Sequence, residues 1–150
     1  MPNLNQLEKK TMSEFMFNKI KKELTPLGIS ISYESDTSHE CVVKHNQNTI
    51  AYISRKVGIT KGYLSVVIAP ELINTLDVQL RPIDGITVKL NSRTKGRYVS
   101  SSNYSGFENK QTQRFLDTNE HVGCAYKLDV SSTFLCIGQF FAVLINTSTI

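Results

Sequence analysis

The sequence lacks the features that mark secreted, disulfide-linked or membrane-spanning proteins. Its three cysteines, Cys41, Cys124 and Cys136, form no CxxC pair, and each lies in an apolar run. Free cysteines in such runs behave as small buried hydrophobes, which favours a reducing compartment. The N-terminus has no apolar signal-peptide segment. The longest apolar stretch, residues 132–145, is shorter than the roughly 20 residues that span a bilayer. We therefore expect a cytoplasmic protein with no membrane partner.

Common cofactor and nucleophile motifs are also missing. The chain contains no GxGxxG, no GxxxxGK[ST] and no GxSxG, the patterns that cradle phosphates or expose a nucleophilic serine. It has no internal repeat and no low-complexity tract. We expect no cofactor, and the absence of a catalytic signature favours a binding protein over an enzyme.

What the sequence does contain is the composition of one ordinary globular domain. The chain has 150 residues, of which 40% are hydrophobic and 20% charged, close to the average soluble domain. A chain of this size buries a sizeable core. The net charge is +4 and the pI is about 9.0, a mildly basic balance that favours the approach of anionic partners.

Two segments have the spacing of amphipathic helices. At 11–28, apolar residues recur every three or four positions, Thr11 and Glu14 match a capping box, and Pro26 with Gly28 ends the helix. The apolar run near the C-terminus would be too long, and apolar on both faces, as a strand. We interpret 131–146 as a helix capped by Ser131 or Ser132.

Between these helices the hydrophobic period changes to two, which predicts half-buried strands. The expected strands lie at 29–35, 40–45, 49–54, 62–70, 86–90 and 122–130. Because the links between the first five are short, we predict an antiparallel meander over Ile29–Leu90, with a helical turn starting at Pro70. Residues 108–121 fit either a short helix or an irregular segment.

The whole pattern predicts one α+β domain over residues 1–150, with residues 1–10 flexible. We expect an antiparallel sheet of about five or six strands with the N-terminal and C-terminal helices packed on one face.

Several segments occur in an order that resembles known proteins. They are AYISRK, LSVVIAP, SNYSGF and the closing DVSSTFLCIGQFFAVL, preceded by the N-terminal helix. This order is similar to that of a group of small bacterial proteins of unknown function, over about Thr11–Leu144. The resemblance implies an α+β fold and carries no activity.

The stretch Asn91–Phe107, NSRTKGRYVSSSNYSGF, is the strongest candidate for a binding surface, and we call it the 91–107 ribbon. If it is extended, Arg93, Lys95 and Arg97 project from one face about 7 Å apart, a spacing suited to a phosphate backbone. Its candidate contact residues also include Tyr98, Ser101, Asn103 and Tyr104. Aromatic rings stack on unpaired bases, and a nest of backbone N–H groups holds anions.

The alternative is that the ribbon is a solvated hairpin tip around Gly96, with Tyr98 and Phe107 turned inward. Arg55 and Lys56, near Lys61, extend the positive surface if two hairpin ends lie on one side of the sheet. The remaining lysines are equally well explained as scattered surface charge.

Other chemistry has weaker support in the sequence. His39, Cys41 and His45 share one face of a strand but lack a second pair of ligands at structural-zinc spacing. Cys41 or Cys124 beside a histidine would be the nucleophile candidates, yet both lie in apolar runs. Three acidic residues precede Lys44 in a loose arrangement that a metal-dependent hydrolase would use; they are Glu34, Asp36 and Glu40.

These observations favour a non-enzymatic binding or accessory protein whose partner is nucleic acid or an acidic protein, contacted through the 91–107 ribbon. The alternative from a different class is a protein–protein interaction module that acts as a homodimer through an open strand edge or an exposed apolar face. A metal-dependent hydrolase is the third possibility.

Overall fold

The computed structural model describes six stretches of the chain: residues 14–33, 40–54, 62–90, 96–100, 122–131 and 133–148. The helices are α2 (Glu14–Leu24), α3 (Ile73–Leu80) and α4 (Leu135–Ser148), with 3-10 turns η1 (Thr25–Leu27) and η3 (Pro70–Leu72). The strands are β1 (Ile29–Tyr33), β2 (Glu40–His45), β3 (Asn48–Ser54), β4 (Tyr63–Ile68), β5 (Ile86–Lys89), β6 (Tyr98–Ser100) and β7 (Val122–Asp129). The predicted α+β class is confirmed.

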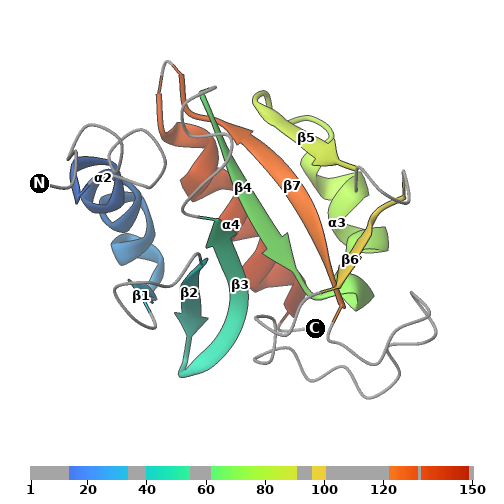
Figure 1. The fold of residues 1–150 in the computed structure, drawn as a ribbon, viewed down its shortest axis with the longest axis horizontal. Helices are drawn as coiled ribbons and strands as arrows, with labels where there is room; N and C mark the ends of the chain where they lie inside the picture. The colour runs from blue at the N-terminus through green and yellow to red at the C-terminus, as the bar shows by residue number, and fades with distance from the viewer. Residues whose placement is uncertain are drawn as a thin grey trace, which may run out of the picture.

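Every strand pairing in the sheet is antiparallel, in the order β1-β2-β3-β4-β7-β5, with β6 also paired to β7 (Figure 1). β5 pairs with β7 from Leu128 to Ala125, and β6 continues along the same edge from Cys124 to Val122. The two short strands therefore share one position in the sheet. This gives six strand positions, as the sequence predicts.

The predicted meander is correct from β1 to β4 and wrong at β5. β5 does not pair with β4, because β7 lies between them. The helical turn expected at Pro70 is present as η3, but it continues into the two-turn helix α3. Because the chain continues from β4 into this helix and does not turn back beside β4, the next position in the sheet is occupied by β7.

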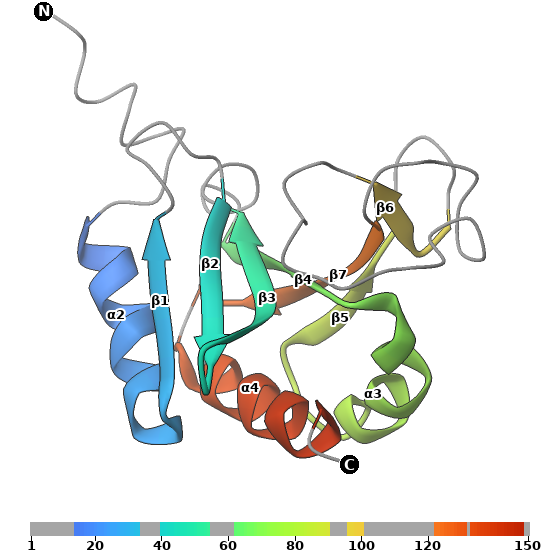
Figure 2. The ribbon, with the colours of Figure 1, turned by 90° about the horizontal axis from the view of Figure 1, so that it is seen from below.

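The helix-covered face of the sheet holds the main core. Residues that alternate along the strands meet all three helices in one cluster, with Ile20 and Leu24 from α2, Leu76 from α3 and Phe140 from α4 fully buried. Figure 2 shows α3 and α4 together on one side of the sheet. The expectation that the first and last helices share a face is therefore confirmed, and α3 joins them there.

The opposite face, which we call the second face, buries a smaller cluster. Val42, Tyr52, Val67 and Ala125 are each at most 5% exposed. Their pairings place them in one row, since Val42 is opposite Tyr52, Tyr52 opposite Val67 and Val67 opposite Ala125. The row continues to Lys89 on β5, which is opposite Ala125. We call the four buried residues the closed row.

Local chemistry explains the tight turns and the start of α4. The β2–β3 hairpin turns through Asn46 and Gln47, both with positive φ (52° and 68°), the conformation that two-residue hairpins require and that asparagine adopts readily. At α4, the Thr133 hydroxyl accepts a hydrogen bond from the Leu135 N–H at 3.1 Å. Of the two predicted caps, Ser131 is wrong, because its hydroxyl instead donates to Asp129 Oδ1 at 2.6 Å. The other, Ser132, lies outside the described residues.

Within the described ranges, the longest helix has 14 residues, and none of the helices there is a candidate for spanning a bilayer.

Candidate anion-binding site

A row of polar side chains crosses three neighbouring strands on the second face, next to the closed row. Lys127 on β7 is opposite Ser65 on β4 and opposite Thr87 on β5. Directly paired residues place their Cβ atoms about 5 Å apart on the same face. The antiparallel register therefore puts a lysine between two hydroxyl groups.

A second lysine is held beside this row. Lys89 lies two residues after Thr87 on β5, so both side chains project from the second face. Its Nζ donates a hydrogen bond to Ser65 Oγ at 3.3 Å. Ser65 itself is only 4% exposed, so its hydroxyl is a fixed acceptor that sets the direction of the Lys89 chain.

Both lysines lie against the same aromatic ring. Lys127 Nζ is 4.8 Å and Lys89 Nζ is 5.9 Å from the centre of the Tyr63 ring. The ring face attracts each ammonium group by a cation–π interaction. Tyr63 therefore gathers two positive charges that repel one another. We call Tyr63, Ser65, Thr87, Lys89 and Lys127 the lysine site.

Carboxylates near the lysine site balance little of its positive charge. Within the described residues neither lysine forms an ion pair; the only pair there is Arg97 with Asp77. Asp129 follows Lys127 by two positions on β7, but its Oδ1 already accepts hydrogen bonds from the Ser131 N–H and hydroxyl at 2.9 and 2.6 Å. These bonds lower the pKa of Asp129.

Glu40 is the other acidic group coupled to the site. Glu40 lies two residues before Val42 on β2, so both side chains project from the second face. Burial raises the pKa of Glu40 to about 7, although the positive charge of Lys89 lowers it. The raised pKa favours the neutral form of this carboxyl group, which weakens its neutralisation of Lys89 near neutral pH.

A separate polar network lies at the same sheet edge on the helix-covered side. Arg97 NH1 and NH2 donate to the two carboxylate oxygens of Asp77 at 2.6 and 3.2 Å, and the Tyr126 hydroxyl donates to the same carboxylate. The Arg97 guanidinium lies 5.3 Å from the centre of the Tyr126 ring. We call these three residues the Asp77 network.

The Asp77 network is electrostatically matched. Burial opposes ionisation of Asp77, but hydrogen bonds from Arg97 and Tyr126 and the charges of Arg97 and Arg81 outweigh it, so the pKa of Asp77 falls. Burial also disfavours the charge on Arg97, yet the Asp77 carboxylate raises the pKa of Arg97. Arg97, one of the predicted anion contacts, thus already has an anionic partner within the chain.

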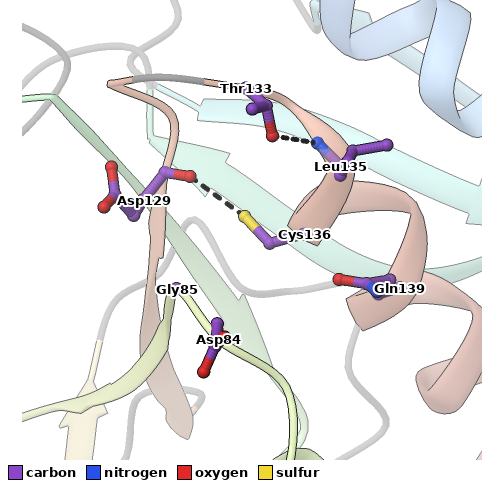
Figure 3. Close-up of a pocket in the computed structure, with 7 residues that line it drawn as sticks. All are labelled: Asp84, Gly85, Asp129, Thr133, Leu135, Cys136 and Gln139. Atoms are coloured by element: carbon purple, nitrogen blue, oxygen red, sulfur yellow. Dashed lines mark hydrogen bonds between the residues drawn. The ribbon is translucent and has the colours of Figure 1, made fainter.

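Two surface pockets flank these groups. One, of about 240 Å³, lies between α3 and β5 beside Asp77 and Tyr126. The other, of about 270 Å³, lies at the start of α4 (Figure 3). In it, the Cys136 thiol donates to the Asp129 carbonyl at 3.1 Å, while the Asp129 carboxylate is turned away. Burial raises the pKa of Cys136, so this thiol is a poor nucleophile.

The predicted ribbon residues are only partly described. Arg97 belongs to the Asp77 network, and Tyr98 begins β6, where its ring packs against the main core. The inward position of Tyr98 agrees with the alternative in which this ring turns toward the core and does not contact a partner. The other predicted contacts lie outside the described residues; they are Arg93, Lys95, Ser101, Asn103, Tyr104, Arg55 and Lys56. Their role stays a prediction.

The weaker candidates can be placed in part. Cys41 is fully buried in the main core, and burial raises the pKa of Cys124 to about 12. His39, Glu34 and Asp36 lie outside the described residues. Among the residues that are described, no group of three or more metal-ligating side chains comes together.

Sequence reasoning missed the lysine site, although two signals for it were present. Lys127 interrupts the otherwise apolar strand VGCAYKLDV, and Lys89 immediately precedes the 91–107 ribbon. A lysine in such a strand indicates a face that is not closed by apolar packing.

The sequence matches no protein-family model, and searches of curated proteins and of solved structures found no significant match. The resemblance in element order to small bacterial proteins stays a prediction. Any functional assignment therefore depends on the lysine site and its surroundings.

Proposed function

We propose that this protein is a non-enzymatic binding module for an anionic partner, with nucleic acid as the partner class. The observation that carries the proposal is the lysine site: two partly buried ammonium groups share one tyrosine ring without an ion-pairing carboxylate among the described residues. Such a pair costs free energy in the isolated protein, and a bound anion offsets that cost.

The position of the site in the chain supports the same partner. Lys89 ends β5, and residues 91–95, which include Arg93 and Lys95, lie between it and β6 in the sequence. The cationic half of the 91–107 ribbon therefore follows the lysine site in the sequence, between two strands that both pair with β7. Phosphate contacts of this kind supply most non-specific affinity for nucleic acid.

The test is fluorescence anisotropy with labelled single-stranded DNA and RNA of about 20 nucleotides over a range of salt concentrations. We expect the logarithm of the affinity to fall linearly with the logarithm of the salt concentration. The double variant Lys89→Met and Lys127→Met should reduce the slope by at least about 0.7, the contribution of one phosphate contact to a single strand. Methionine keeps the apolar part of each lysine chain.

A matched control removes two lysines from another surface. Lys21 and Lys22 are exposed on α2, so Lys21→Met with Lys22→Met changes the net charge equally and should leave the slope nearly unchanged. The proposal is contradicted if the wild-type protein shows no salt-dependent binding, or if the two double variants reduce the slope by the same amount.

A second function is favoured by one specific observation. Val78 on α3 and Val88 and Leu90 at β5 are 59%, 42% and 56% exposed, and Val88 lines the pocket between α3 and β5. Exposed apolar residues around an edge strand are typical of homodimer contacts.

Light scattering after size exclusion separates this second function from the first. A dimer through β5 should show a mass that falls on dilution and on Val88→Asp, which places a charge on the edge strand. The Lys89→Met and Lys127→Met changes should leave that mass unaltered. A monomeric mass at all concentrations excludes the homodimer.

A further inference from the structure

We infer that the lysine site binds one phosphate monoester group rather than a run of internal phosphodiesters. This inference rests on the proposed function, because it names the part of the anionic partner that the site holds. The shared ligand chemistry is a phosphoryl group with two negative charges and three free oxygens. Its two possible sources are the phosphorylated end of a nucleic acid strand and a small phosphorylated compound.

The donor set matches such a group in number and charge. Lys89 and Lys127 provide two ammonium groups, and Thr87, which is exposed and directly opposite Lys127, provides a hydroxyl donor. Two positive charges balance a monoester dianion, whereas an internal diester carries one charge and offers two free oxygens. Ser65 is engaged with Lys89 and nearly fully buried, so it orients the site without facing the ligand.

The surroundings limit the site to a short ligand segment. On one side it borders the closed row, in which Tyr52, Val67 and Ala125 are at most 4% exposed. A polymer backbone that continued along this row toward β3 would find no accessible polar group on these three residues. On the other side β7 ends at Asp129, whose negative charge disfavours a second phosphate there.

The neighbouring network supplies the contrast within the same sheet edge. Arg97 is bonded through both terminal nitrogens to Asp77, so its charge is matched inside the chain. The lysine pair has no such partner among the described residues. An external dianion should therefore stabilise the two lysines more than it stabilises Arg97.

The experiment compares short oligonucleotides that are identical except for a 5′-phosphate or a 5′-hydroxyl group, with inorganic phosphate and a sugar phosphate as small probes. Binding is followed by the backbone amide NMR signals of Thr87, Lys89 and Lys127 at constant ionic strength. We expect the 5′-phosphate to increase oligonucleotide affinity about tenfold, the effect of one or two charge-assisted hydrogen bonds. We expect the Lys89→Met and Lys127→Met double variant to lose that difference, and the Lys21→Met and Lys22→Met control to retain it.

The outcomes separate this inference from the proposed function. Equal affinity for the 5′-phosphate and 5′-hydroxyl oligonucleotides, without a saturable response to the small probes, overturns the monoester site but leaves nucleic-acid binding intact. Saturable shifts with the small probes, but no oligonucleotide binding, support the site and reject nucleic acid as the partner. A sugar phosphate that binds more tightly than the 5′-phosphorylated oligonucleotide supports the site and identifies a small compound as the source.

Discussion

The two faces of the sheet differ in how their apolar side chains are packed and in whether their charges are paired. On the helix-covered face, apolar side chains from three helices fill the space above the strands, and the charges at its edge are paired as Arg97 with Asp77. On the second face, a closed row of four residues lies beside two lysines that share a ring and form no ion pair within the described residues. The first face is closed by apolar packing and carries a paired charge, whereas the second carries two lysine charges without an ion pair among the described residues.

The largest expected effect comes from truncating a buried side chain on each face. Phe140 is fully buried and contacts the rings of Tyr126 and Phe141 edge-on, so Phe140→Ala should lower the free energy of unfolding by about 3–5 kcal/mol. Val67→Ala in the closed row should cost only about 1–2 kcal/mol, because it removes two methyl groups from a smaller cluster. Urea denaturation of both variants measures the two losses of unfolding free energy and so gives their ratio. Equal losses would mean that both faces are packed alike.

The second effect concerns the buried carboxyl group of the second face. The pKa of Glu40 is about 7 in the folded protein and 4.5 in its reference state. Between these pH values the folded chain holds a proton that the unfolded chain has released, so stability falls as the pH rises through this window and levels off above pH 7. The full effect is of order 3 kcal/mol.

Glu40→Gln removes this titration. We expect the variant to be more stable than the wild type at pH 8 and similar to it near pH 4, with thermal denaturation across the pH range as the measurement. A wild-type stability that does not decrease between pH 5 and pH 7 would show that Glu40 titrates normally and is not held in a poorly solvated position.

Comparison of the two faces also shows which features were predictable from the sequence. The period-two strands and the helix-spaced runs are local patterns. They placed β1 to β4 and β7 correctly, and they placed α4 over most of its length but with too early a start. The position of β7 between β4 and β5 depends on pairing between residues far apart in the chain, such as Ser65 with Lys127. No local pattern specifies that partner, so the sheet order at this edge was not predicted.

The same limit applies to the candidate site. Ser65, Thr87 and Lys127 come from three separate strands and become neighbours only through the register of β7. The segment that the sequence favours begins two residues after Lys89 and contains Arg97, so it is adjacent in the chain to one residue of the lysine site. It missed the Asp77 network, since nothing in the spacing of Asp77, Arg97 and Tyr126 links helix α3 to strand β7 and to the residue before β6.

A third, smaller effect tests the paired charges of the helix-covered face. Asp77→Asn should lower the free energy of unfolding by about 1–2 kcal/mol at pH 7, a value reduced because the two side chains are 20% and 30% exposed. Because the pKa of Asp77 is lowered in the folded state, this contribution is complete above the ordinary aspartate pKa and is lost as the pH falls below it. Wild type and variant should therefore converge in acid. A difference that persists at low pH would point to packing rather than charge.

The smallest effect is the salt response of the lysine site in the absence of a ligand. Salt screens the repulsion between Lys89 and Lys127, so the wild type should gain a few tenths of a kcal/mol in unfolding free energy, relative to Lys127→Met, when sodium chloride rises from low to high concentration. Chloride binds weakly compared with phosphate, and Lys44→Met, on an exposed β2 position of the same face, serves as the control for general charge effects. If Lys127→Met and Lys44→Met respond to salt alike, the two charges do not repel measurably at the Tyr63 ring. The physical reason for an anion to bind between them is then removed, whatever the affinity of the 91–107 ribbon for nucleic acid.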